Sequence, residues 1–528
     1  MATSEQPNVT TKIGRIARST LVISAGWGAS IVVGLLRQRV IAGQFGTGAE
    51  LDAFTAANVV PELIYTMLSG GALSFAFIPV YKERLEKGEG ASALFSKVVN
   101  WIFLITLIAS SISLVLAPWL VGSKWGVAAL YSADIQLLTT QLMRILLLST
   151  LIFSISSIIT SALYAHEHFL IPALLPSLYS AGIIFGALVL VPKMGVFGIA
   201  WGAVLGSLLH LLIQIPALIY YKVRWVPLLR FDPALKRVAI LMFPRIVDLM
   251  MARASINWLN ATLSSRLGEG RLAALDFAYR LMNMPWTLIG TAIGIAVFPT
   301  MAALAAQKDV NAQRKALSGS LRAILTLAIP AAVALIVLGE PIIRILFEGG
   351  EFTAESTQLV YYALQFYALA LISQSMLEVV VRAFAAQQDT YTPLYISMFT
   401  TIVNIGLAIW LTRPFEAGGI SHAGPALANG IAVLIEASIG LLILSIRWKG
   451  VDIQHILKDL GKALFASAIM ALVVILVKRF LPGGDLIQLV IGGGLGLLIY
   501  LVIVYFLGIK EIIQIPLAMI KRRTTGDE

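Results

Sequence analysis

Apolar runs of about twenty residues recur along the whole chain, and short segments between them carry most of the charged residues. A helix needs about twenty apolar residues to cross the hydrocarbon core of a bilayer. A membrane β-barrel would show shorter segments of alternating hydrophobicity instead. The pattern therefore predicts an all-α polytopic membrane protein with fourteen transmembrane helices. We place these near residues 17–42, 52–80, 96–120, 136–163, 170–191, 196–221, 238–264, 272–304, 319–340, 356–385, 391–411, 420–446, 461–480 and 486–508.

Basic residues gather in most of the loops that follow even-numbered expected spans. They precede the first span and follow the second, sixth, eighth, twelfth and fourteenth, as in Lys82, Arg84 and Lys87 after the second. The alternate loops contain only scattered basic residues such as Lys124 and Arg413. By the positive-inside rule, both termini are expected in the cytoplasm. The polar N-terminal segment leads directly into the first apolar run, which favours a retained helix over a cleaved signal peptide.

Composition agrees with the apolar pattern. The chain has 528 residues, of which 58% are hydrophobic and 13% charged, whereas a soluble protein carries about 25% charged residues. The net charge of +11 lies in short loops between spans, so topology explains it better than nucleic-acid binding. The chain contains no cysteine, which excludes disulfides and thiol chemistry.

The two halves of the chain share three sequence matches. Asp52 lies nine residues before Pro61, and Asp276 lies nine residues before Pro285. SALYAHEHFLIP (161–172) parallels RAFAAQQDTYTP (382–393), and GIA at 198–200 parallels GPA at 424–426. The offsets are 224, 221 and 226 residues, so the matches agree on one period. Six spans separate equivalent positions, which predicts parallel repeats with a substrate site between them.

This repeat predicts four regions. Residues 1–222 form an N-lobe of spans one to six, and 223–237 form a basic cytoplasmic linker. Residues 238–447 form a C-lobe of spans seven to twelve, and 448–528 hold spans thirteen and fourteen with a basic tail.

Four arginines interrupt or end apolar runs: Arg37, Arg39, Arg253 and Arg280. An arginine inside a membrane helix costs about 2.5–3.5 kcal/mol on insertion scales, so it is expected to face a polar cavity or a partner. Arg37 and Arg39 could instead extend to the headgroup layer. Arg280 lies four residues after Asp276 and could form a local pair with it. Alternatively, Arg280 faces Arg37 across a central cavity, where two guanidinium groups would suit a phosphate or pyrophosphate.

Other patterns carry less chemistry. His166 and His168 form an H-x-H with one further acid, too few ligands to predict a metal site. The glycines from Gly492 to Gly496 fit close helix packing better than nucleotide binding, because no strand precedes them. No Walker A sequence is present. No cofactor is predicted. Coupling to a monovalent cation, for example at Glu378 or Glu436, or to the membrane potential is left open.

Several longer segments together resemble the MurJ (MviN) family of lipid II flippases, within the multidrug/oligosaccharidyl-lipid/polysaccharide exporter superfamily. They are QFGTGAELDAF, GGALSFAFIPVY, RLGEGRLAALDFAYRLMNMP, FEGGEFT and RAFAAQQDTYTP. The resemblance implies a transporter rather than an enzyme. It would move the undecaprenyl-pyrophosphate-linked peptidoglycan precursor from the inner to the outer leaflet of the bacterial cytoplasmic membrane by alternating access. The last two spans would shape a groove for the lipid tail.

The resemblance also implies binding residues. Arg37 matches the family's second arginine of span one, Asp52 its span-two aspartate and Arg280 its span-eight arginine. Arg39 and Arg253 would add to the positive field. The family's first span-one arginine falls on Ser30-Ile31 here, and an arginine of span two falls on Tyr65. A sodium site described for some members is not carried over, because Ala408 replaces its acid beyond Asn404.

Three other functions stay open. One is a polysaccharide-lipid flippase or a drug/cation antiporter of the same superfamily, although an antiporter for cations would need acids rather than arginines in its cavity. Another is an enzyme acting on polyprenyl phosphates, which the lack of a metal-binding carboxylate cluster disfavours. The third is a transport-inactive cell-wall scaffold. Expected partners are the lipid-linked precursor, membrane lipids and cell-wall synthesis enzymes, with a monomeric protein and no nucleic acid.

Overall fold

The protein is all-helical. The computed structural model describes residues 9–68, 71–88, 90–480 and 483–509, and these contain helices and no β-strand. Eleven helical segments among them are long and apolar enough to cross a membrane. The described residues of the first, second and seventh spans expected from the sequence are also helical, and these spans contain Arg37, Asp52 and Arg253. The total of fourteen spans stays a prediction.

The chain divides into two compact units, Met1–Glu269 and Gly270–Glu528. Helix α10, the start of the expected seventh span, packs on α2 and α3 within the first unit. The lobe boundaries drawn from the sequence repeat stay a prediction.

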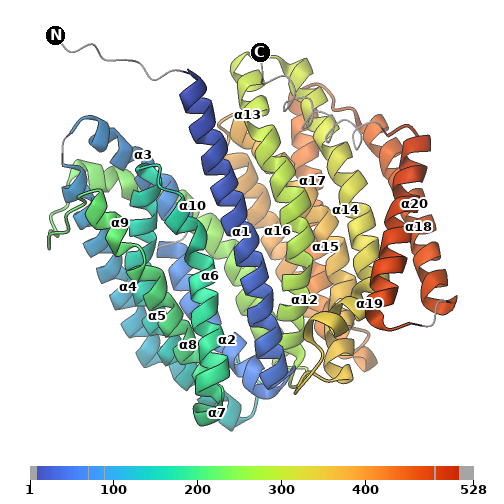
Figure 1. Cartoon of the computed structure of the whole chain (residues 1–528), viewed down its shortest axis with the longest axis horizontal. Coiled ribbons are helices and arrows are strands. Elements are labelled where there is room, and N and C mark those ends of the chain that lie inside the picture. Colours follow the sequence, from blue (N-terminus) through green and yellow to red (C-terminus); the bar gives the residue numbers. More distant parts are fainter. Residues whose placement is uncertain (1–8, 69–70, 89, 481–482, 510–528) are drawn as a thin grey trace. The chain divides into compact units, whose positions relative to one another are not determined.

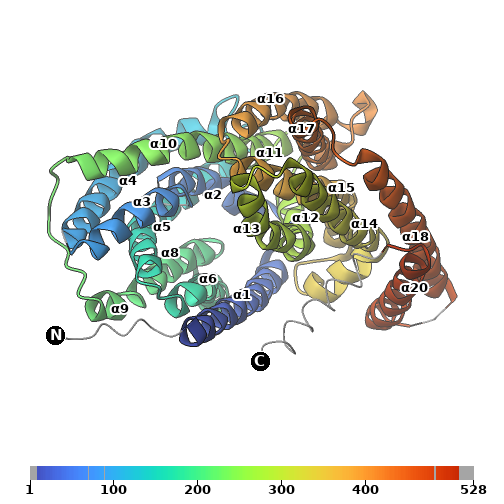
Figure 2. The same ribbon diagram turned by 90° about the horizontal axis from the view of Figure 1, so that it is seen from above.

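The first unit contains eleven α-helices and two π-helical segments within its described residues (Figure 1). They are α1 (Val9–Phe45), α2 (Ala49–Leu68), α3 (Gly71–Glu86), α4 (Ala91–Gly122), α5 (Ala133–Ala165), α6 (Leu170–Phe185), η1 (Gly186–Leu190), α7 (Val191–Met194), α8 (Phe197–Leu212), α9 (Ile215–Tyr220), α10 (Pro233–Arg253), η2 (Ala254–Trp258) and α11 (Leu259–Ser264). Figure 2 shows α1 running beside α6, and α10 running along α3.

The second unit also consists of helices within its described residues. Its elements are α12 (Arg271–Trp286), η3 (Thr287–Thr291), α13 (Ala292–Ala306), α14 (Val310–Phe347), α15 (Ala354–Ala386), α16 (Tyr391–Leu411), η4 (Phe415–Ala417), η5 (Ser421–Ala423), α17 (Gly424–Arg447), α18 (Ile453–Phe480), α19 (Asp485–Ile487), η6 (Gln488–Gly492) and α20 (Gly493–Phe506). Helices α18 and α20 pack together, and α18 packs on α14 (Figure 1). Arg322 of α14 pairs with the buried Asp459 of α18.

Glycines allow α6 and α8 to pack backbone against backbone. Gly198, Gly202 and Gly206 recur every fourth residue on α8, opposite Gly182 and Gly186. A Cβ atom added at Gly202 would lie 2.8 Å from the carbonyl oxygen of Gly182 and 2.9 Å from the Cα atom of Gly186. Small residues at this spacing permit close helix association where no hydrophobic effect drives it.

The turn after α5 and the turn after α15 have the same backbone geometry. Glu167 and Gln388 both have φ of 59°, and the amides of His168 and Asp389 donate to the carbonyl groups of Leu163 and Phe384. These positions fall at the offset of 221 residues that the sequence match gives. Helices α5 and α15 also have equal lengths of 33 residues.

An extended segment, residues 221–232, connects α9 to α10, and we call it the strap. Its backbone is held by polar side chains along one face of α4. Asn100 donates to the carbonyl groups of Val226 and Leu228, both at 3.0 Å. Two more side chains of α4 bind the strap: the Ser96 hydroxyl accepts from the amide of Val226 at 3.0 Å, and the Trp101 indole donates to the carbonyl of Leu229 at 3.1 Å. These side chains satisfy backbone groups that the extended strap cannot pair internally.

Candidate functional site

Arg37 lies on a polar seam between α1 and α6. Its guanidinium group donates to the hydroxyl of Ser180 at 3.4 Å. Two turns earlier on α1, the hydroxyl of Ser30 lies 3.0 Å from that of Ser177. The helices approach closely because Gly26 has no side chain: a Cβ atom there would lie 2.5 Å from the Cβ atom of Ala173. The seam thus places a half-buried arginine beside hydroxyl groups rather than in lipid.

Arg39 and Asp52 lie on either side of the turn between α1 and α2, in different environments. Arg39 is exposed, whereas Asp52 is fully buried. Asp52 accepts a hydrogen bond of 2.8 Å from the hydroxyl of Tyr131, in the connection from α4 to α5. Burial raises the pKa of Tyr131, and the adjacent Asp52 raises it further. Asp52 therefore fixes the start of α2 against the rest of its unit.

Arg253 forms an ion pair with Glu62, which lies one residue beyond Pro61 in α2. The closest nitrogen and oxygen atoms are 3.6 Å apart, and the two side chains are 42% and 34% exposed. The pair joins α10 to α2 within the first unit. At this exposure the arginine remains accessible to an anionic group.

Arg280 forms the local pair that its spacing from Asp276 suggested. Its Nε atom donates to the carboxylate at 2.6 Å, and the arginine side chain is 44% exposed. Both residues lie on α12, one turn apart, so the helix itself sets their geometry. An ion pair with this exposure contributes little to stability, which leaves the guanidinium group able to exchange partners.

Tyr65, at a position where the resembled family has an arginine, belongs to an aromatic group. Its ring packs on Phe153 of α5, with ring centroids 5.3 Å apart. Phe153 also contacts Tyr179 of α6 and His210 of α8 at 5.1 and 5.0 Å. The hydroxyl of Ser156 lies 2.6 Å from Nδ1 of His210. At Tyr65 the protein therefore has an aromatic group with polar edges, whereas the family resemblance predicts a cation at this position.

The histidines of the H-x-H sequence contact aromatic residues. His166 stacks on Tyr221 with centroids 4.6 Å apart, and His168 lies 3.3 Å from the Tyr221 hydroxyl. Burial lowers the pKa of both histidines. Within the described residues, no three His, Asp or Glu side chains gather as a metal site requires.

The acids of the second unit also have partners. Glu378 pairs with Arg382 at 2.8 Å and accepts from Thr291. Glu436 accepts from the hydroxyl of Thr400 at 3.1 Å. Glu378 is therefore the ion-pair partner of Arg382, one turn away on the same helix.

Sequence reasoning missed two residues that position the candidates. Ser180 contacts Arg37, and Tyr131 contacts Asp52, each from more than seventy residues away. Serine and tyrosine are common in and between membrane helices, so neither carries a local signal. In each unit taken by itself, a partly exposed guanidinium group lies next to a carboxylate, and such a group can bind an anion.

The comparisons with known proteins agree with each other. The family model described as "Lipid II flippase MurJ" matches residues 41–494. The lipid II flippase MurJ of Burkholderia cenocepacia is 29% identical over 449 residues, covering 82% of this chain and 84% of that protein. The probable lipid II flippase MurJ of Rhizobium tropici is 28% identical over 515 residues, covering 93% of each chain.

Solved structures give the same assignment of fold. A structure titled "Lipid II flippase MurJ, inward closed conformation" has a TM-score of 0.78 and 27% identity, covering 92% of this chain and 98% of that one. An inward-facing multidrug resistance MATE family transporter of the MOP superfamily has a TM-score of 0.66 and 17% identity, covering 80% of this chain and 94% of that one. The second similarity concerns the fold alone.

Proposed function

The chain belongs to the MurJ family of lipid II flippases, and from this membership we infer that it moves lipid II across the bacterial inner membrane. The observation that carries the inference is the family match over residues 41–494. The eleven apolar helices among the described residues support a multi-pass membrane protein, and its function is transport. Basic loops favour cytoplasmic termini, and alternating access would carry the substrate from the inner to the outer leaflet.

We propose that Arg37 and Arg280 hold the pyrophosphate of lipid II, with Arg39 and Arg253 adding to the positive field. Guanidinium groups bind phosphate oxygens through two parallel hydrogen bonds, which suits a pyrophosphate better than a point charge does. The partial exposure of Arg253 and Arg280 supports this role. Asp52 is proposed to act indirectly, since its buried carboxylate positions the start of α2.

Acids adjacent to these arginines suggest how the substrate binds and leaves. Arg253 is paired with Glu62 and Arg280 with Asp276. A pyrophosphate would replace each carboxylate as the partner of its arginine, and the carboxylate would reclaim the arginine as the substrate departs. Such exchange keeps the binding step reversible, which transport requires. Movement of charge during this cycle would couple transport to the membrane potential, at about 2.3 kcal/mol per charge per 100 mV.

The polyprenyl tail is proposed to lie along α18 and α20, the last two spans. Both helices carry large exposed apolar residues, among them Leu472, Ile475, Leu497 and Leu498. This surface would allow the tail to remain in lipid while the headgroup crosses the membrane.

Native mass spectrometry of the purified protein with lipid II, and with ordinary phospholipids as competitors, tests the proposal. We expect lipid II to bind preferentially to the wild type. Arg37→Ala and Arg280→Ala should each weaken lipid II binding by about tenfold, the equivalent of about 1.4 kcal/mol for a lost charged hydrogen bond. The matched control is Arg413→Ala, which removes an exposed arginine from the loop after α16. A wild type without preference for lipid II, or variants that bind it equally well, would contradict the assignment.

A further inference from the structure

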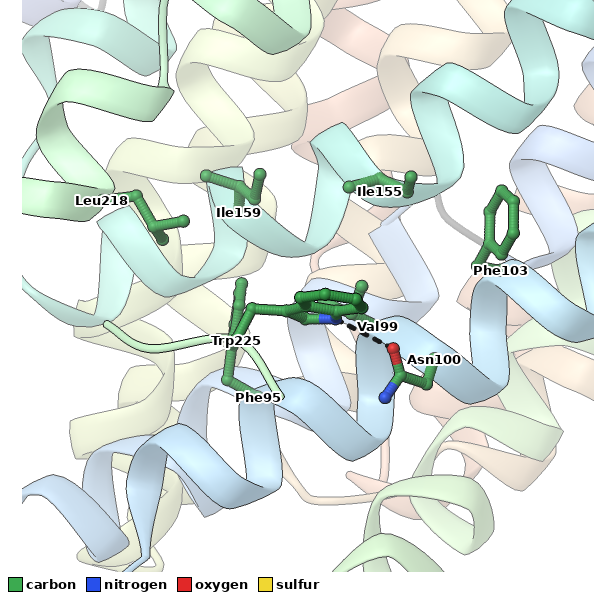
Figure 3. Close-up of a pocket in the computed structure, with 8 residues that line it drawn as sticks. All are labelled: Phe95, Val99, Asn100, Phe103, Ile155, Ile159, Leu218 and Trp225. Carbon is green, nitrogen blue, oxygen red and sulfur yellow. Dashed lines mark hydrogen bonds between the residues drawn. The ribbon is translucent and has the colours of Figure 1, made fainter. Parts of the chain in front are cut away.

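An apolar cavity lies in the first unit where the strap crosses α4 and α5. Its volume is about 240 Å³. It is lined by Phe95, Val99 and Phe103 of α4, Ile155 and Ile159 of α5, and Leu218 of α9 (Figure 3). An apolar lining of this kind suits apolar groups, because their burial removes apolar surface from water.

Trp225 of the strap forms one wall of the cavity. Its indole nitrogen donates to Oδ1 of Asn100 at 2.9 Å, which fixes the ring over α4 (Figure 3). The amide nitrogen of Asn100 is already engaged by two strap carbonyl groups. The one polar side chain of the lining is therefore satisfied. A peptide entering the cavity would bury backbone groups without partners, at a cost that an alkyl chain avoids.

The strap outside the cavity combines exposed basic and aromatic residues. Lys222, Arg224 and Arg230 are exposed, and no ion pair involving them occurs within the described residues. Trp225 and Phe231 are 57% and 58% exposed. Tryptophan and basic residues gather at the boundary between lipid and water, and clustered Lys and Arg there attract anionic lipids.

The cavity lies beside the N-terminal half of α4, next to the strap. Phe103 lies eight residues after Phe95 on α4, with Val99 between them, a distance of about 12 Å at a rise of about 1.5 Å per residue. Farther along the same helix, Ile108 and Ile112 are 52% and 54% exposed, as expected for a surface facing lipid. Along α4, the cavity therefore lies between the basic, aromatic strap and an exposed apolar stretch of the helix.

We propose that the strap and this cavity bind an anionic phospholipid of the membrane. Its phosphate contacts Arg224, with Lys222 and Arg230 adding to the positive field, and part of one acyl chain fills the cavity beneath Trp225. The bound lipid holds the connection between the sixth and seventh spans against α4. This site goes beyond the proposed lipid II function and shares no residue with the arginines assigned to it.

The test compares phosphatidylglycerol with phosphatidylcholine of the same acyl chains, bound to delipidated full-length protein and measured by native mass spectrometry. We expect the wild type to prefer phosphatidylglycerol. Arg224→Gln should reduce that preference about fivefold, the equivalent of about 1 kcal/mol per basic residue at an anionic surface. Arg413→Gln, an exposed arginine of the second unit, is the control for charge.

A second variant tests the cavity itself. Ile155→Trp fills it and should reduce binding of both lipids, whereas Ile112→Trp adds the same side chain to an exposed position of α4 and should change neither. Unchanged lipid II binding by Ile155→Trp establishes that the variant folds and separates this site from the flippase site. Equal binding of the two phospholipids by the wild type, or unchanged binding by both Arg224→Gln and Ile155→Trp, would overturn the proposal.

Discussion

Replacing Gly202 by alanine should destabilise the first unit, because α6 and α8 leave no room for a side chain there. The added Cβ atom would lie 2.8 Å from the carbonyl oxygen of Gly182 and 2.9 Å from the Cα atom of Gly186, whereas ordinary contacts are 3.4–4 Å. Both neighbouring atoms belong to helix backbone, so neither can rotate away. The two helices must therefore separate by about 0.5–1 Å.

The magnitude follows from two opposing contributions. Overpacking of a well-packed interface costs about 1–3 kcal/mol, and the rigidity of the neighbouring backbone places this case near the upper limit. Replacing glycine by alanine within a helix contributes about 0.5–1 kcal/mol in the other direction. The net destabilisation should be about 2 kcal/mol. Gly28→Ala, on α1, meets nothing within 4 Å among the described residues, so that variant should show only the stabilising contribution.

Thermal unfolding of the purified variants in one detergent, followed by circular dichroism and by loss of the monodisperse gel-filtration peak, measures the difference. Gly202→Ala should unfold below the wild type, and Gly28→Ala at or above it. If both variants unfold at the temperature of the wild type, the close contact between α6 and α8 is not required for stability.

Two further predictions concern carboxylates outside the membrane and at helix ends. Tyr131→Phe removes the hydroxyl that donates to the buried Asp52, and it should lower the free energy of unfolding by about 1.5–3 kcal/mol. Thermal unfolding measures this effect. The control is Tyr395→Phe, which makes the same change at an exposed tyrosine. Burial opposes ionisation of Asp389, but hydrogen bonds from Thr392 and Arg447 outweigh it and lower the pKa of Asp389 to about 2. The stabilisation is therefore present above about pH 4 and is lost as pH falls toward 2, so the difference in unfolding temperature between wild type and Asp389→Asn should shrink over that range.

The hydrophobic pattern predicted the helical class and most element positions, because a membrane span needs a long apolar run whatever it contacts. It also suggested the Asp276–Arg280 pair, since residues four apart on a helix are neighbours. The hydrophobic pattern could not predict contacts between segments that are far apart in the sequence. Ser92, Ser96 and Asn100 recur every fourth residue on an apolar helix, which indicates a polar face. Their partners, however, are backbone groups of the strap, which no side-chain pattern identifies.

The positions of the acids explain how Arg253 and Arg280 are paired within their own units. A guanidinium group facing lipid is costly, and a buried, strongly held ion pair would be equally unsuitable because it would not release its arginine. Glu62 and Asp276 avoid both problems, since their pairs with Arg253 and Arg280 are partly exposed. Arg37 uses the hydroxyl of Ser180 in a similar way. A pyrophosphate offers more charge and more acceptor oxygens than one carboxylate or hydroxyl, so it should take over these arginines, and the local partners should recover them when it leaves.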